Sequence, residues 1–125
     1  MTRIQILMTK EGISGFVAKG HTGYSEHGTD IVCAAVSALT QTAVLGLQEV
    51  LGIPVDIEID TEKGYLKCML PEELTSVLWQ QSQVVLQVMH HGLKAIMQEY
   101  GNKYVRIEEV ELCGSISNCL LRKKV

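Results

Sequence analysis

The sequence predicts an α+β domain, a two-layer sandwich in which a mainly antiparallel sheet of about five strands packs against two helices. Three observations support this prediction. Short segments with alternating polar and apolar residues occur in pairs, each pair is followed by a longer helical segment, and a further alternating segment comes last. The expected order is therefore strand, strand, helix, strand, strand, helix, strand.

Each expected element has the periodicity of its type, and turn or capping residues mark its ends. Asp30 is placed to cap a first helix that begins at Ile31 and ends near Gly52. Pro71 is expected to open the second helix, and Gly101 to end it. The strands are expected at residues 4–9, 13–19, 55–60, 65–70 and 104–111.

Length and composition predict one domain over residues 1–125, with the residues after about 111 forming a tail. The alternating start lacks the continuous apolar segment of a secretory signal. The apolar run of residues 31–39 is too short to cross a bilayer. We therefore expect a soluble, cytoplasmic protein without a membrane partner. Its four cysteines lack metal or disulfide spacing and are expected to be reduced thiols: Cys33, Cys68, Cys113 and Cys119.

The charge balance excludes one class of partner. A net charge of −3 and a pI near 5.8 argue against a surface that neutralises many phosphates. The one basic cluster in the sequence, residues 122–124, lies at the C-terminus and is interpreted as a solvated tail. No direct contact with nucleic acid is expected.

The segment of residues 20–29 is predicted to be a flexible loop, because Gly20, Gly23 and Gly28 are separated by polar residues. No core residue is expected to anchor its middle. His21 lies where this loop leaves the second strand, and the loop must return to the start of the first helix. Substrate binding is expected to order the loop and complete the site.

Cys33 is the candidate nucleophile. With Asp30 as cap, it lies in the first helical turn, where unpaired N–H groups and the helix dipole favour a thiolate. His21 is the candidate general base, which would take the thiol proton and return it to the leaving amine after sulfur attacks a peptide carbonyl. The N–H groups at the helix start would hold the oxyanion.

Two polar residues are candidates for supporting roles. Asp30 would either fix the helix start or orient His21. Ser37 lies one turn after Cys33, from where its hydroxyl would reach the thiolate or the imidazole, or else bond back to the Cys33 carbonyl. No metal and no cofactor are expected.

Each candidate has a structural alternative. Free cysteines are often buried, so Cys33 could be a packing residue, and this is the only interpretation offered for Cys68. A metal site using His21, His27 and Cys33 matches no known zinc spacing. His90 and His91 are adjacent on a helix, diverge, and are expected at the surface. The loop lacks the phosphate-binding pattern G-x-x-x-x-G-K-[ST].

The Gly20-His21 pair, the glycine-containing loop and the segment D-I-V-C-A-A-V-S at residues 30–37 resemble the motif of the ribosomal-processing cysteine protease (Prp) family. The resemblance covers residues 3–111. It implies that Cys33 takes the place of the nucleophile and His21 that of the histidine, with Asp30 and Ser37 at the other polar positions. Thr22 stands where a small alanine is common in the family.

The resemblance also implies a function and an assembly. Members of the family are homodimers that remove an N-terminal extension from the twenty-seventh large-subunit ribosomal protein. An apolar cleft for an extended peptide would follow. The alternatives are a non-catalytic ribosome-associated or dimeric binding module, with an unreactive Cys33, and a metal or redox site using His27 with Cys33.

Overall fold

The computed structural model describes residues 1–26, 30–112 and 121–123, and its elements follow the expected order with one strand added. The strand and helix order ββαββαβ of the α+β prediction is confirmed. The added strand, β6, belongs to the segment that was expected to be a tail. The elements are β1 (Thr2–Met8), β2 (Ile13–Lys19), α1 (Ile31–Leu45), the π-helical turn η1 (Gly46–Val50), β3 (Asp56–Asp60), β4 (Tyr65–Met69), α2 (Ser76–Tyr100), β5 (Val105–Leu112) and β6 (Leu121–Lys123).

The strands form one sheet in the order β3-β4-β2-β1-β5-β6. β1 and β5 pair in parallel, whereas β1–β2, β2–β4, β3–β4 and β5–β6 pair antiparallel. The sheet is therefore mainly antiparallel, as predicted. β3 is an edge strand, so one row of its backbone groups has no neighbouring strand within the described residues.

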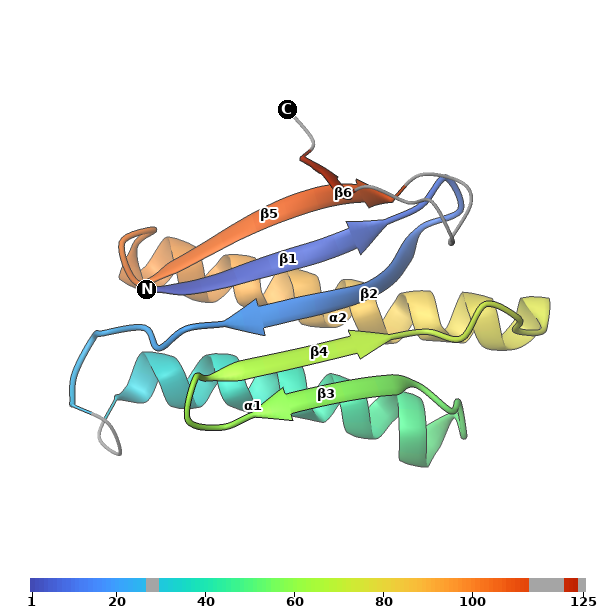
Figure 1. Ribbon diagram of the computed structural model, residues 1–125, viewed down its shortest axis with the longest axis horizontal. Coiled ribbons are helices and arrows are strands. Elements are labelled where there is room, and N and C mark those ends of the chain that lie inside the picture. Colours follow the sequence, from blue (N-terminus) through green and yellow to red (C-terminus); the bar gives the residue numbers. More distant parts are fainter. Residues whose placement is uncertain (27–29, 113–120, 124–125) are drawn as a thin grey trace.

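Both helices lie on one face of the sheet, and Figure 1 shows them behind the strands. The core fills the space between the two layers. Side chains alternate between the two faces of each strand, so Ile4, Phe16 and Cys68 face the helices and are at most 1% exposed. Leu86 and Leu93 of α2 close the core from the other side.

The second helix begins later than predicted. It starts at Ser76 because the hydroxyl of Thr75 accepts a hydrogen bond from the Leu78 N–H at 3.2 Å and caps the first turn. Pro71 thus precedes the helix and does not open it. At its C-terminus the helix ends before Gly101, as expected, where φ is +100°.

α1 and η1 together cover Ile31–Val50, and these 20 residues have a mean hydropathy of 1.6. By length and composition alone, this helix would cross a membrane. Its length was not expected from the sequence, because polar residues 40–42 interrupt the apolar run that begins at residue 31. In the fold, Val32, Val36, Ala43 and Leu47 of this helix are buried in the core, and 28% of the apolar window is buried.

Candidate active site

Cys33 lies in the first turn of α1, as predicted, and is partly exposed. Asp30 is the N-cap: its backbone is extended, with φ −79° and ψ 102°, and its Oδ1 accepts from the Cys33 N–H at 2.9 Å. This cap occupies the N–H of the candidate nucleophile itself. The donors left for an oxyanion are the N–H groups of Ile31 and Val32, which precede the first intrahelical bond.

The other carboxylate oxygen of Asp30 holds the preceding loop. Oδ2 accepts from the Thr22 hydroxyl at 2.5 Å, from the Tyr24 N–H at 3.0 Å and from the Ser25 N–H at 3.3 Å. Burial by itself disfavours the charged carboxylate, but these bonds and the one from Cys33 outweigh it, so the pKa of Asp30 lies below its usual value. Asp30 therefore caps α1 and ties the loop to it as an ionised side chain.

The loop is anchored, which the sequence did not lead us to expect. Its middle residue Tyr24 packs edge-on against the rings of Tyr100 and Tyr104, with centroids 5.5 and 5.1 Å away. Thr22 is 1% exposed. The loop is thus held by the buried polar Thr22 and by the ring contacts of Tyr24, whose side chain is 40% exposed and not part of the core. Because Tyr100 ends α2 and Tyr104 lies in the turn between α2 and β5, the loop is fixed to the end of the second helix.

The glycines of the loop have the backbone freedom that was predicted. Gly20 has φ +91° and Gly23 has φ +73°, in the left-handed region that favours glycine. Gly28, together with His27, lies outside the described residues, so the metal alternative that needs His27 also rests on a position outside them. Among the described residues, no group of three or more His, Cys, Asp or Glu side chains forms a metal site.

His21 lies at the end of β2, is exposed, and contacts the turn between β3 and β4. Its Nε2 lies 3.2 Å from the carbonyl oxygen of Glu62. A carbonyl only accepts, so this hydrogen bond requires a proton on Nε2 and leaves the lone pair of the neutral ring on Nδ1. Gly64 supports the same arrangement: with φ +61°, a Cβ on it would lie 3.1 Å from His21 Cε1.

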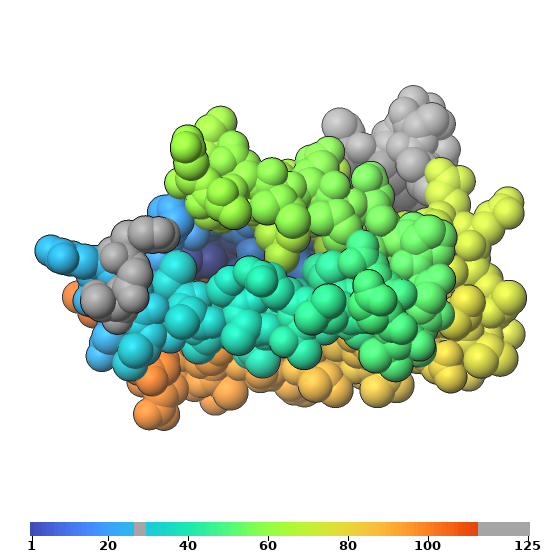
Figure 2. All heavy atoms as spheres, turned by 90° about the horizontal axis from the view of Figure 1, so that it is seen from below, coloured from blue at the N-terminus to red at the C-terminus, as the bar shows by residue number. Residues whose placement is uncertain are grey.

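A hollow separates α1 from the β3–β4 hairpin, and Figure 2 shows deeper atoms of the N-terminal strands at its bottom. α1 carries Cys33 on one side, and the turn of the hairpin holds His21 on the other. Ile59 of β3 pairs with Leu66, which faces the helices, yet it remains 65% exposed. The hollow thus lies between the helix to which Cys33 belongs and the hairpin whose turn contacts His21, and the exposed Ile59 gives the hairpin apolar surface.

Ser37 takes a different partner from those expected. Its hydroxyl accepts from Gln41 Nε2 at 2.7 Å on the exposed side of α1. The described hydrogen bonds include none from this hydroxyl to the Cys33 carbonyl or to a side chain of the candidate pair. Ser37 lies on the face of α1 that carries Cys33, but one turn away from the thiol.

The remaining cysteine and histidine predictions have mixed outcomes. Cys68 is a core residue, as interpreted, and burial followed by the charge of Asp56 raises the pKa of its thiol to about 12. His91 is exposed as expected. The surface prediction for His90 is wrong: it is 8% exposed, because it lies on the side of α2 that faces the sheet. Cys113 and Cys119 lie outside the described residues.

Two residues that organise the site were not predicted. Thr22 was noted only as a departure from the family pattern, and Tyr24 was treated as a loop residue. The available signals were the β-branched Thr22 and the aromatic Tyr24, which stand out within a glycine-rich loop. Such side chains stabilise the fold when they pack against other residues, so they indicate that the loop has packing partners. Their partners could not be identified, since Tyr100 and Tyr104 are far away in the sequence.

The fold and the sequence agree with known proteins. The family described as Cysteine protease Prp matches residues 1–106. A ribosomal processing cysteine protease Prp of Bacillus subtilis (strain 168) is 32% identical over 90 residues, which are 72% of this chain and 80% of that protein.

Two crystal structures of the essential ribosomal processing protease Prp from S. aureus are also similar. The complex with a covalently linked product peptide has a TM-score of 0.77 at 27% identity, and the complex with a substrate peptide has a TM-score of 0.72 at 26% identity. Each comparison covers 87% of this chain and 99% of the other. The chain therefore belongs to the Prp family of cysteine proteases.

Proposed function

We propose that this protein is a cytoplasmic cysteine endopeptidase that removes the N-terminal extension of the twenty-seventh large-subunit ribosomal protein, with Cys33 as nucleophile and His21 as general base. The observation that carries the proposal is the hollow between α1, to which the partly exposed Cys33 belongs, and the β3–β4 hairpin, whose turn contacts His21. The S. aureus relatives support it, because they bind a substrate peptide and a covalently linked product peptide.

The proposed reaction uses groups whose positions are known. Nδ1 of His21 takes the proton of Cys33, and the sulfur forms a bond to the carbonyl carbon of the scissile peptide. His21 then gives this proton to the leaving amine, and water hydrolyses the acyl-enzyme. The N–H groups of Ile31 and Val32 are the donors nearest to the developing oxyanion at this helix start.

Asp30 and Ser37 have supporting roles in this proposal. Asp30 is a positioning residue, because its carboxylate binds the Cys33 N–H and the loop that follows His21. Ser37 lies one turn after Cys33 on α1 and would contact the peptide rather than the thiolate. Rearrangement of the loop on substrate binding stays a prediction, with Gly20 and Gly23 as its pivots.

The substrate would bind as an extended chain. β3 is the edge strand beside the hollow, and an edge strand binds a peptide by continuing the sheet. The exposed side chain of Ile59 gives this edge an apolar contact for the peptide.

The test is cleavage of a peptide copied from the N-terminal extension of the ribosomal protein. Cys33→Ala and His21→Ala are each expected to abolish cleavage, whereas Cys68→Ala, a control that removes a buried thiol, keeps it once folding is verified by circular dichroism. Undiminished cleavage by either of the first two variants would refute the mechanism. Cleavage by none of the proteins, the parent included, would favour the non-catalytic binding module.

We also propose that the protein is a homodimer that uses the outward face of its helical layer. Val77, Val84 and Val88 of α2 are 61–67% exposed and recur at helical spacing on one stripe. Ile31 and Leu45 of α1 are 56% and 55% exposed on the same layer. A second copy presents the same stripes, so face-to-face packing would bury both pairs of helices.

The oligomeric state tests this interface. Val88→Glu places a charge inside the stripe and is expected to give a monomer by light scattering, because burying an unpaired charge is costly. Gln87→Glu, the matched control on the neighbouring exposed position, is expected to remain a dimer. A parent protein that is monomeric at all accessible concentrations would eliminate this interface, while the peptidase proposal would stand.

A further inference from the structure

Three cationic side chains form a row across neighbouring strands of the sheet. Arg106 of β5 is the register partner of Arg3 of β1, and Arg3 is also the partner of Lys19 of β2. The row then reaches Tyr65 of β4, the partner of Lys19. We call Arg106, Arg3, Lys19 and Tyr65 the cationic row.

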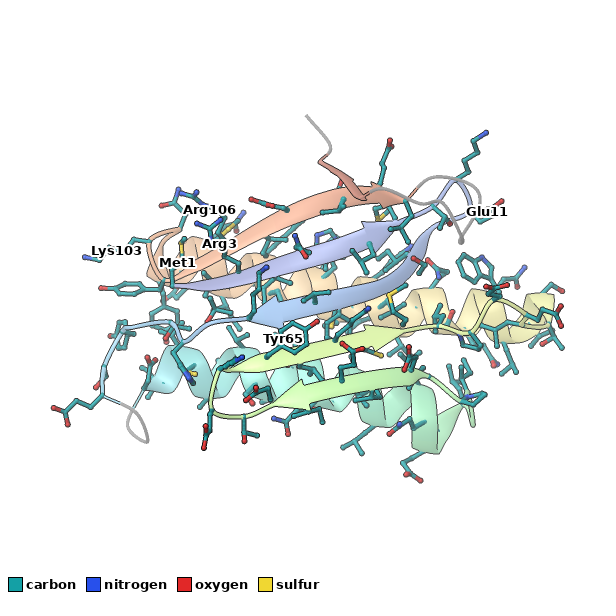
Figure 3. The ribbon with its side chains drawn as sticks, viewed as in Figure 1. Met1, Arg3, Glu11, Tyr65, Lys103 and Arg106 are labelled. Atoms are coloured by element: carbon teal, nitrogen blue, oxygen red, sulfur yellow. The ribbon has the colours of Figure 1, made fainter. Side chains whose placement is uncertain are left out.

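The cationic row lies on the face of the sheet that carries no helix. Ile4 and Ala18, next to Arg3 and Lys19 in sequence, are buried toward the helices, and consecutive side chains of a strand point to opposite faces. The three cationic residues are exposed, and Tyr65 is half-buried. Figure 3, drawn from this face, shows Arg3 and Arg106 side by side, with Lys103 near them.

The arrangement is unfavourable for the protein alone. Like charges on directly opposite strand positions repel and destabilise a sheet. Among the described residues, no carboxylate is part of the row itself: Glu108 is on the same face farther along β5, and Asp60 ends the row beyond Tyr65. A row of this kind within a chain of net charge −3 is explained by an anionic ligand.

The spacing and the tyrosine indicate which anion. Neighbouring strands are about 4.8 Å apart, so three cations in a row follow a line of about 10 Å, which suits consecutive charges along a chain. An aromatic ring at the end of such a line offers a base a stacking surface, and proteins bind single-stranded nucleic acids by combining cations with aromatic side chains on a sheet. An acidic peptide would use the cations but would gain less from the ring.

We propose, against the expectation drawn from the net charge of −3, that the cationic row binds single-stranded RNA, with Arg106, Arg3 and Lys19 on its phosphates and Tyr65 stacked on a base. This site does not rest on the proposed peptidase function. The row lies on the helix-free face of the sheet, whereas the hollow lies between the sheet and α1. RNA and a peptide would therefore be able to bind at the same time. A protein substrate that is already bound to RNA would be held by both surfaces.

The test measures the anisotropy of a short, labelled, single-stranded RNA of mixed sequence over a series of salt concentrations. The parent protein is expected to bind, with an affinity that falls as salt rises. Arg3→Gln combined with Arg106→Gln removes two phosphate contacts and is expected to lower the slope of log affinity against log salt by about 1.4, since each contact on single strands contributes about 0.7.

The matched control removes the same charge elsewhere. Lys10→Gln combined with Lys94→Gln, both exposed and outside the row, is expected to leave the slope unchanged. An equal loss in both double variants, or no RNA binding by the parent at low salt, would overturn the site.

Tyr65 gives an independent readout. Tyr65→Leu is expected to weaken RNA binding about tenfold without changing the salt slope, and Tyr65→Phe to keep the parent affinity, because stacking needs the ring and not the hydroxyl. A glutamate-rich peptide that binds as tightly as the RNA, is weakened by the arginine variant and is unaffected by Tyr65→Leu would identify an acidic protein partner and overturn the RNA assignment.

Discussion

His21 is held by backbone groups of a turn that is distant from it in the sequence. The Glu62 carbonyl fixes its Nε2, and Gly64 lets the turn approach so closely that a Cβ would lie 3.0 Å from the Gly20 carbonyl oxygen and 3.1 Å from His21 Cε1. The position of the proposed base thus depends on a residue that carries no functional group.

Gly64→Ala is expected to reduce kcat/KM by roughly tenfold to a hundredfold, because the added methyl displaces His21 and small misplacements are costly in catalysis. Gly52→Ala is the matched control: Gly52 has a similar φ of +67°, but a Cβ there meets nothing within 4 Å. Both variants should lose roughly 1 kcal/mol of stability from the left-handed backbone. Equal kcat/KM values for the two variants, measured on the extension peptide, would contradict this role of Gly64.

Cys33 and Cys68 differ in their surroundings, which predicts a difference in reactivity. Cys33 is partly exposed at a helix start, whereas Cys68 is 1% exposed and its thiol pKa is raised to about 12. Brief alkylation of the native protein at neutral pH, followed by peptide mass spectrometry, is expected to modify Cys33 and leave Cys68 intact. An inert Cys33 in the folded protein, also with peptide present, would argue against its role as nucleophile.

At the scale of elements, the start of α1 and the loop before it form one unit. Asp30 joins them because each of its oxygens binds a different segment, Oδ1 the Cys33 N–H and Oδ2 the groups of Thr22, Tyr24 and Ser25. The Tyr24 ring then fixes this unit to the end of α2. The proposed nucleophile and the segment that follows the proposed base are therefore positioned by a single carboxylate.

Asp30→Asn tests this coupling. Asparagine still caps a helix, but an amide nitrogen facing the three loop donors leaves them unsatisfied, so we expect a loss of about 1–3 kcal/mol in the free energy of unfolding by urea. Thr22→Val removes one donor and is expected to cost about 1 kcal/mol.

The pH dependence of the parent follows from the lowered pKa of Asp30. Its stabilising contribution is present above the unfolded pKa near 3.8 and is lost as the pH falls through the lower folded value. If Asp30→Asn is as stable as the parent at neutral pH, the carboxylate does not join the two segments.

At the scale of the whole molecule, a buried polar atom between the helical layer and the sheet lacks a hydrogen bond among the described residues. His90 of α2 is 8% exposed, and its Nε2 has no hydrogen-bond partner among the described residues. Burial first, and then the charges of Lys94 and His91, lower the pKa of His90, while Glu109 on the helix-facing side of β5 opposes the shift. The folded protein therefore keeps this imidazole neutral at a pH where the unfolded chain would protonate it.

The sign of the effect on stability follows. Below about pH 6.5, His90 binds a proton in the unfolded state but stays neutral in the folded state. The free energy of unfolding therefore falls as the pH falls from 6.5 toward the lower folded pKa of His90. His90→Met is expected to remove this part of the pH dependence and to raise the free energy of unfolding at pH 7 by about 1 kcal/mol, since no buried polar atom is left unsatisfied.

His91→Gln is the control for this prediction, because its side chain is exposed on the same helix. It is expected to keep the slope of the parent between pH 6.5 and more acidic values in urea titrations. A His90→Met variant with an unchanged slope would show that other groups account for the acid sensitivity.

Much of the site could be predicted because its signals are local. Cys33, three residues after a capping aspartate, needs only the helix start to define its surroundings. His21 was a candidate because it begins the loop, but its partner Glu62 comes from another hairpin. Thr22 and Tyr24 were missed for the same reason, because a loop sequence does not specify where the chain will fold to meet it.

The elements and their order can be predicted from local residue patterns, because alternation, helical periodicity and capping residues act over a few positions. Which strands are neighbours cannot be predicted in this way and follows from how the chain folds. The resulting strand order brings Arg3, Lys19 and Arg106 into one row, adds β6 to the sheet, and places Glu109 near enough to the buried His90 to influence its pKa. The physical reason is range: periodicity is a property of consecutive residues, whereas register is set by which apolar faces fill a common core.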